Sequence, residues 1–350
     1  MEQYFVNMTV RALDAKAHPV LEKTRCINYR QGKIKCTKCA EVCPSGMLVT
    51  PEKGQIDWAK CVDCDLCAVV CPAKAFGLSG VHFQKAQALC KVGALQPIRT
   101  LGCDMSEVPL EFSGWCLGSI PWELICMLAL DSQVELVRGK CDNCPNAAGL
   151  EPFERTLERT RLFLGSACFA RQVRVTEACD ATPPKLTRRE ALGAALWGIR
   201  RTVGASLGNL PAQNDGLLFR LLLVHKLSQP NAAGADSAIS ETGCGWQSPE
   251  FSEACWACGI CAKICPNGAI SVVERQGTRY LVHEPCLCTG CCACQAVCPE
   301  KAIVQISEKR LDRTARCVAT RVLSESCTRC AGAVKPGTGP LCTRCRALKK

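Results

Sequence analysis

The sequence holds few of the groups from which a substrate-converting site is built. It has no G-x-G-x-x-G turn after a predicted strand, no P-loop, no H-E-x-x-H pair and no Ser-His-Asp order. We therefore predict that the chain is not an enzyme by itself. Its four histidines are scattered, and we interpret them as surface or packing residues rather than ligands; they are His18, His82, His225 and His283.

Long apolar segments are also missing. The longest apolar run, Leu124–Leu130, is far too short to span a bilayer. Residues 1–25 are interrupted by charges and contain no apolar h-region of a signal peptide. We expect a soluble, cytoplasmic protein without a transmembrane segment. A peripheral membrane contact would require the amphipathic helix predicted over Thr187–Leu207, for which a packed connector is the favoured interpretation.

Cysteine is what the sequence has in abundance, with 32 in 350 residues. Such a content is typical either of a disulfide scaffold in a small secreted domain or of metal binding in a reducing cell. Many of these cysteines are separated from the next by two residues on a short stretch, which suits cluster or zinc geometry. The spacing therefore favours metal binding.

Four cysteine motifs organise the chain. Cys61–Pro72 reads C-x2-C-x2-C-x3-C-P, and Cys255–Pro266 and Cys288–Pro299 repeat it in full. The copy ending at Cys43-Pro44 has Lys33 where its first cysteine is expected, and Cys26 is the nearby replacement. This spacing is typical of [4Fe–4S] ligation. The candidate cluster ligands are Cys26, Cys36, Cys39, Cys43, Cys61, Cys64, Cys67, Cys71, Cys255, Cys258, Cys261, Cys265, Cys288, Cys291, Cys294 and Cys298.

These motif pairs resemble a tandem of bacterial-type dicluster 2[4Fe–4S] ferredoxins, an electron-transfer polyferredoxin. The resemblance covers Cys26–Gly80 and Cys255–Ser307 and leaves the middle third outside. It implies four [4Fe–4S] clusters and an exchange of fourth ligands within each pair. Cys43 would then join Cys61, Cys64 and Cys67, while Cys71 would join Cys26, Cys36 and Cys39. The alternative for the latter cluster is three protein ligands, as in a [3Fe–4S] type.

Two further cysteine groups lie outside these motifs. Cys327, Cys330, Cys342 and Cys345 form two C-x2-C pairs around a Gly/Pro-rich spacer, which predicts a zinc-ribbon-like or rubredoxin-like knuckle with zinc as the default metal. Cys103, Cys116, Cys141 and Cys144 in the middle segment are candidates for a [2Fe–2S] cluster or zinc. The alternatives are buried core cysteines and a redox-active Cys141/Cys144 dithiol. We interpret Cys90, Cys126, Cys168 and Cys179 as structural, and Cys286 and Cys292 as bystanders.

The net charge of +11 belongs to the chain without its clusters. Four oxidised cubanes with four thiolates each, together with a four-cysteine zinc site, bring about −10. The basic excess thus largely offsets cluster charge, and we infer no nucleic-acid partner from it.

The predicted fold class is α+β: two ferredoxin-like dicluster units joined by an α/β middle segment and a helical linker, with a small C-terminal zinc-ribbon-like knuckle. Hairpins are expected before Cys61 and before Cys288, and a βαβ unit is expected from Ile98 to Val137. The predicted divisions are residues 1–80, 81–180, 181–243, 244–312 and 313–350.

The pattern predicts an electron carrier that relays single electrons, as a subunit or partner of a redox enzyme or of another carrier. The alternative is an iron–sulfur regulatory or assembly factor with an interaction tail. A third hypothesis is an enzyme with a catalytic cluster. Complete paired motifs favour the carrier, because a sensor usually needs one cluster.

Overall fold

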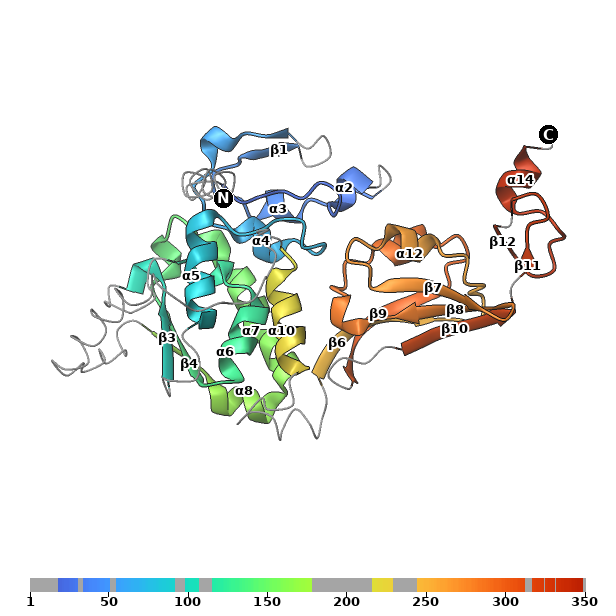
Figure 1. Ribbon diagram of the computed structural model, residues 1–350. Helices are drawn as coiled ribbons and strands as arrows, with labels where there is room; N and C mark the ends of the chain where they lie inside the picture. The colour runs from blue at the N-terminus through green and yellow to red at the C-terminus, as the bar shows by residue number, and fades with distance from the viewer. Residues whose placement is uncertain are drawn as a thin grey trace, which may run out of the picture.

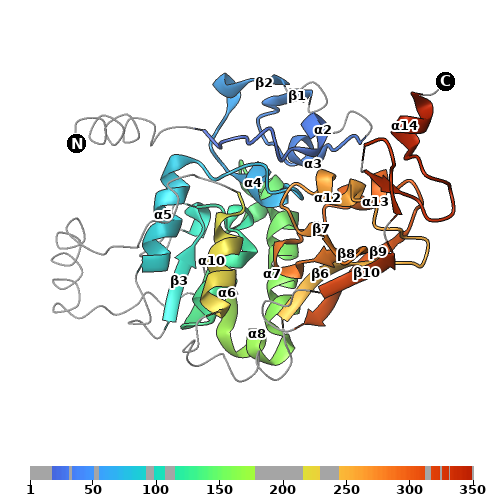
Figure 2. The same cartoon turned by 45° about the vertical axis from the view of Figure 1, so that its right-hand side comes forward.

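The computed structural model describes most of the chain, namely residues 18–30, 34–50, 55–91, 98–106, 115–177, 216–228, 244–311, 317–323, 325–330 and 332–348. The helix expected over 187–207, Cys179, the linker at 231–240 and most of the first 25 residues lie outside these ranges. Helices and strands are mixed, as an α+β fold requires. Figures 1 and 2 show the N-terminal and middle parts in blue to green beside the C-terminal unit in orange.

The N-terminal unit consists of short elements around its cysteine loops. In chain order they are α2 (Ile27–Arg30), α3 (Lys38–Glu41), β1 (Leu48–Thr50), β2 (Gln55–Ile56), the 3-10 turn η2 (Trp58–Lys60) and α4 (Leu66–Val70). Strands β1 and β2 pair antiparallel, which confirms the predicted hairpin. Helix α4 ends at Val70 because the proline after Cys71 pushes that residue out of helical conformation.

The middle domain is a parallel sheet covered by helices. Its elements are α5 (Gly80–Lys91), β3 (Ile98–Gly102), η4 (Asp104–Ser106), η5 (Leu117–Ser119), α6 (Trp122–Ala129), β4 (Gln133–Arg138), η6 (Cys141–Asn143), η7 (Ala147–Gly149), α7 (Leu150–Leu164), α8 (Ser166–Gln172) and β5 (Val173–Glu177). Strands β3, β4 and β5 lie in that order, all parallel, so the predicted βαβ unit is confirmed, and β5 extends it. Every residue of α6 is buried, as expected for a helix that is apolar on nearly all sides.

A connector helix, α10 (Leu218–Leu227), packs on α6 and reaches the C-terminal unit. That unit contains β6 (Cys244–Phe251), α12 (Ile260–Ile264), β7 (Ile270–Arg275), β8 (Thr278–His283), η9 (Pro285–Leu287), α13 (Ala293–Val297), β9 (Ile303–Leu311) and β10 (Cys317–Leu323). The predicted β7–β8 hairpin is present, and β10 adds to β8 as a third strand. Strands β6 and β9, which the sequence patterns did not predict, frame the unit as an antiparallel pair. The tail adds β11 (Glu325–Ser326), β12 (Ala333–Val334) and α14 (Thr343–Ala347).

Helix α7 holds the C-terminal unit against the middle domain. The ring of Phe163 on α7 meets the fully buried Trp246 of β6 edge to face, with centroids 4.9 Å apart. Arg159, also on α7, forms an ion pair with Glu308 of β9. Aromatic packing of this kind stabilises an interface beyond the area it buries. The C-terminal unit is therefore docked through an aromatic core contact and a partly buried ion pair.

A buried ionic network joins the N-terminal unit, the middle domain, the connector helix and the C-terminal unit. Glu123 of α6 lies 3.1 Å from the Nζ of Lys74 in the N-terminal unit and 3.7 Å from the guanidinium of Arg220 on α10. Arg220 is 2% exposed, and it donates hydrogen bonds to three backbone carbonyls around η9 in the C-terminal unit. Because buried charges are costly without partners, this network favours one relative placement of these parts.

In the part of the chain that the structure describes, no helix combines the length and the apolar content needed to cross a bilayer.

We predict that Arg220→Met strongly destabilises the protein. The change leaves Glu123 and three buried carbonyls short of a partner, and loss of one member of a buried ion pair costs about 3–5 kcal/mol. A fall of several degrees in the thermal midpoint of the cluster-loaded chain is the expected result. The matched control is Arg155→Met, which removes an exposed pair with Glu151 and should change stability little. Equal midpoints for the two variants would contradict the role of the network.

Candidate metal centres

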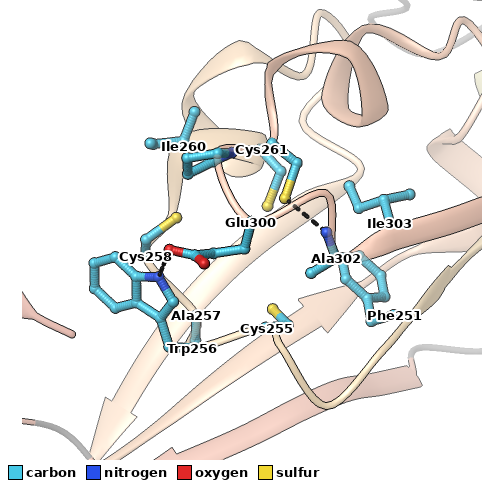
Figure 3. A pocket seen from close by; sticks show the side chains of 12 residues that line it. Phe251, Cys255, Trp256, Ala257, Cys258, Ile260, Cys261, Glu300, Ala302 and Ile303 are labelled. Atoms are coloured by element: carbon cyan, nitrogen blue, oxygen red, sulfur yellow. Dashed lines mark hydrogen bonds between the residues drawn. The ribbon is translucent and has the colours of Figure 1, made fainter. Parts of the chain in front are cut away.

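The first cysteine set of the C-terminal unit lines one small cavity. Cys255, Cys258 and Cys261 come from one loop, and Cys298 comes from the other motif. Figure 3 shows the sulfurs of the three labelled cysteines facing a shared space enclosed by apolar side chains. Ala257 and Gly259 have positive φ, which lets so short a loop turn its cysteines inward. The donor set and the apolar wall fit an iron–sulfur cluster.

The second set of this unit lines a separate cavity, and its members are Cys265, Cys288, Cys291 and Cys294. Left-handed backbone at Gly290 and Cys292 turns this loop in the same way. Cys286 is buried beside the loop, and Cys292, although exposed, also lines this cavity. Each motif thus lends its last cysteine to the cavity of the other motif, which is the exchange that the resemblance implies.

Backbone N–H groups donate hydrogen bonds to the sulfur of the last cysteine in three of the motifs. Ala269 donates to Cys265 Sγ at 3.2 Å, and Ala302 donates to Cys298 Sγ at 3.3 Å. In the N-terminal unit, Ala75 donates to Cys71 Sγ at 3.2 Å. Such bonds stabilise the thiolate form and help to set the potential of a cluster.

The outer set of the N-terminal unit also lines a cavity, and it comprises Cys43, Cys61, Cys64 and Cys67. Its loop depends on left-handed backbone at Asp63 and Asp65. Asp65 is almost fully buried and accepts hydrogen bonds from the backbone and hydroxyl of Ser79 and from His82 Nδ1. This carboxylate therefore ties the cysteine loop to the start of α5.

The remaining N-terminal set includes the off-pattern Cys26. Burial foremost raises the pKa of the Cys39 thiol to about 12, and the charges of three neighbouring thiols add to it, those of Cys71, Cys36 and Cys26. The side chain of Asn28 clasps the backbone of Cys36, donating to its carbonyl and accepting from its N–H, both at 2.8 Å. This clasp brings Cys26 beside Cys36 although their sequence spacing departs from the motif.

The set that contains Cys36 and Cys71 lies beside the set that contains Cys291. We call these two the inner sets, and the other set of each unit the outer set. Ile27, Ala73 and Ala293 form one buried apolar cluster, against which Cys36, Cys71 and Cys291 also pack. Arg30 donates to the carbonyl of Lys263 at 2.7 Å across the same boundary. A cavity of about 260 Å³ lies alongside, and its walls include Cys71, Gly290 and the cations Lys74, Arg159 and Arg220.

The tail cysteines form a tighter group than the ferredoxin-like sets. The sulfurs of Cys327, Cys330, Cys342 and Cys345 all lie within 4.8 Å of one another. Four thiolates at about 2.3 Å from one zinc are about 3.8 Å apart, so this spacing fits a single ion. The backbone N–H of Cys342 foremost lowers the pKa of the Cys327 thiol, whereas a side-chain hydrogen bond with Cys330 foremost raises the pKa of the Cys345 thiol to about 12.

Three histidines occupy defined places. His18 lies 2.8 Å from Asp63 and stacks on Trp58, and its ring nitrogen, Asp63 and Cys61 form a group within 4.8 Å that the sequence patterns did not reveal. His82 pairs with Asp65 in the loop bond described above. Burial lowers the pKa of His283 to about 4, so it stays neutral.

Comparison with known proteins agrees with the cysteine geometry. Residues 254–302 match the family described as 4Fe-4S dicluster domain, and residues 55–76 match the 4Fe-4S binding domain. The chain carries ferredoxin-type 4Fe–4S domains. A stretch of 48 residues is 44% identical to a subunit of the ion-translocating oxidoreductase complex of Methanosarcina acetivorans, covering 13% of this chain and 18% of that protein. This chain thus spans less than a fifth of that relative's length. No solved structure matches it.

We predict that Cys26→Ala removes one cluster from the N-terminal ferredoxin unit. Anaerobically reconstituted protein should lose about four iron and four sulfide, because three cysteines hold a cubane poorly. Iron and sulfide analysis of the full chain measures this. Cys168→Ala, which removes a buried cysteine of α8 outside the cysteine sets, is the matched control. Equal iron in both variants would mean that Cys26 is not a ligand.

We predict one tightly bound zinc in the tail. Cys342→Ala should abolish it and unfold the segment around α14, while the visible absorbance of the ferredoxin units stays unchanged, because so small a segment needs the metal to fold. Zinc analysis and hydrogen exchange of residues 325–348 report the two effects. The control is Cys317→Ala on β10, outside the group. Full zinc content in the Cys342 variant would refute the site.

Proposed function

We propose that this chain is a cytoplasmic electron carrier that relays single electrons through four [4Fe–4S] clusters. The cysteine sets would hold them as Cys43 with Cys61, Cys64 and Cys67; Cys26, Cys36 and Cys39 with Cys71; Cys265 with Cys288, Cys291 and Cys294; and Cys255, Cys258 and Cys261 with Cys298. When bound, such clusters supply one-electron exchange over a wide range of potentials.

The observation that carries the proposal is the unbroken adjacency of these sets. Burial foremost raises the pKa of the Cys67 thiol in the N-terminal unit, and the charge of Cys39 in the adjacent set contributes. In the C-terminal unit burial likewise raises the pKa of the Cys294 thiol, and the charge of Cys261 in the adjacent set contributes. Between the units, Cys71 and Cys291 pack on one apolar cluster. A sensor or a catalytic site has no need of such a sequence of neighbouring centres, whereas a carrier depends on it.

The chain's own residues would tune the central step. Lys74, Arg159 and Arg220 line the cavity between the inner sets. Cations there lower the cost of adding negative charge to either side. The carbonyl bonds of Arg220 also hold the segment leading to Cys288 in place.

A larger redox enzyme is the partner we propose. The relative named above is a subunit of an oxidoreductase complex. Nothing in the motifs provides a two-electron cofactor, so a partner must couple the relay to a substrate. We propose that this chain docks to such a complex as its electron-transfer subunit.

We predict that the purified, reconstituted chain accepts electrons from a low-potential donor such as reduced methyl viologen and passes them to an added one-electron acceptor. It should show no sustained oxidation of NADH or NADPH alone, because it lacks a flavin or nucleotide motif. Anaerobic stopped-flow absorbance measures both reactions. NAD(P)H-dependent turnover without any added enzyme would overturn the carrier assignment.

A further inference from the structure

Four cysteines outside the ferredoxin units converge at one edge of the middle sheet. Cys103 directly follows β3, and Cys141 and Cys144 follow β4, so all three lie at the carboxyl ends of neighbouring parallel strands. Cys116 stands just before η5, on the segment that returns to this edge. The carboxyl edge of a parallel sheet is where such folds hold ligands.

Close backbone contacts bring these loops together. A Cβ on Gly139 would lie 2.3 Å from the carbonyl oxygen of Met105, so the loops of Cys103 and Cys141 touch through a residue without a side chain. A Cβ on Gly118 would lie 2.1 Å from the carbonyl oxygen of Gly149, which joins the loop of Cys116 to the segment after Cys144. Only glycine permits both approaches.

The sulfurs have the surroundings of ligands. Met105 donates its N–H to Cys103 Sγ and Asn146 donates its N–H to Cys144 Sγ, both at 3.3 Å, as the alanines do in the ferredoxin units. All four cysteines are free thiols. Without a metal, gathering four thiols in one place adds little packing stability, because each cysteine would pack equally well in the core on its own.

The spacing of the sulfurs favours a cluster over a single ion. Among the described residues, the tail cysteines are the one set of four whose sulfurs all lie within 4.8 Å of one another. The middle set is more open, like the ferredoxin sets, and one zinc needs sulfurs about 3.8 Å apart. The ferredoxin sets, whose motifs are typical of clusters, are open in the same sense, so the middle set fits a cluster better than a single ion.

We propose that Cys103, Cys116, Cys141 and Cys144 bind a fifth iron–sulfur cluster at the edge of the middle sheet. The site adjoins the outer N-terminal set, because a Cβ on Gly149 would lie 2.8 Å from Cys116 Sγ and 3.2 Å from Leu66, which stands between Cys64 and Cys67. Its other side is half-exposed at Cys141 and Cys144. The fifth centre thus extends the chain of sites from the N-terminal unit to the surface of the middle domain.

The redox role of this site rests on the proposed carrier function, whereas its occupancy does not. Exchange with the neighbouring set transfers one electron, so that one centre is oxidised by one electron and the other is reduced by one; no bond forms or breaks. Acting at the half-exposed end, the fifth cluster offers a second point for a partner to deliver or collect electrons.

The test is metal analysis of the full chain after anaerobic reconstitution with iron, sulfide and zinc. The parent should contain more iron than the sixteen or so that four cubanes account for. Cys116→Ala and Cys144→Ala should lose the same increment, two to four iron with equal sulfide, and keep the tail zinc. The control is Cys168→Ala, a buried cysteine of the same domain on α8, which should match the parent.

Mössbauer spectra of the parent keep the result independent of how well the variants fold, because the fifth cluster must appear there as additional iron. Parent iron that four cubanes fully account for, a second zinc in place of the extra iron, or unchanged iron in both variants would overturn the proposal. A relay that fails in the stopped-flow assay while the extra iron is present would contradict the carrier function and leave the site standing.

Discussion

The buried guanidinium of Arg220 is the interaction on which the arrangement of the chain depends. It faces Glu123, which also holds Lys74, and it donates to carbonyls on the approach to Cys288. One charge cluster therefore joins the N-terminal unit, the middle domain, the connector and the C-terminal unit. Replacing such a network by apolar residues is often tolerated energetically, but losing one member is not, so its effect is to make one arrangement strongly preferred.

That arrangement fixes where the cysteine sets lie relative to one another. Loops turned by left-handed residues such as Asp65 and Gly259 gather thiols whose burial raises their pKa values. Bringing several thiols together in this way is costly for the metal-free chain, and it is offset when a positively charged metal or cluster binds. We therefore expect folding of these units to be coupled to metal binding. The cations between the inner sets then compensate the negative charge that the loaded sites carry.

Much of the local structure could be predicted from the sequence because it is encoded at short range. The spacing in Cys61–Pro72 predicts a cysteine loop, and the resemblance it carries implies that the last cysteine joins the ligands of the paired motif. Turn residues predict the hairpins. The clasp of Asn28 on Cys36 could not be foreseen, because it is a side-chain to backbone contact across a loop and leaves no mark in the cysteine spacing. Strand β6 is likewise hidden, since its partner β9 lies far along the chain and its pattern includes Pro249.

The middle cysteines also show that contacts between distant segments cannot be predicted from local sequence patterns. The sequence shows Cys103 and Cys116 as isolated residues, and only the parallel register of β3 with β4 places Cys103 beside Cys141. Arg220 also looks ordinary in sequence, as one cation in an apolar helix. Its importance follows from what it meets in space, the carbonyls of a unit more than sixty residues later.

The central claim is that the inner cysteine sets of the two units hold neighbouring clusters. The most direct measurement is electron paramagnetic resonance of the reduced Cys61→Ala/Cys116→Ala/Cys255→Ala triple variant, in which the outer sets and the middle site are disabled and iron analysis should give about eight iron. We expect a spectrum split and broadened by interaction between the two remaining spins. A spectrum equal to the sum of two isolated centres would contradict the claim.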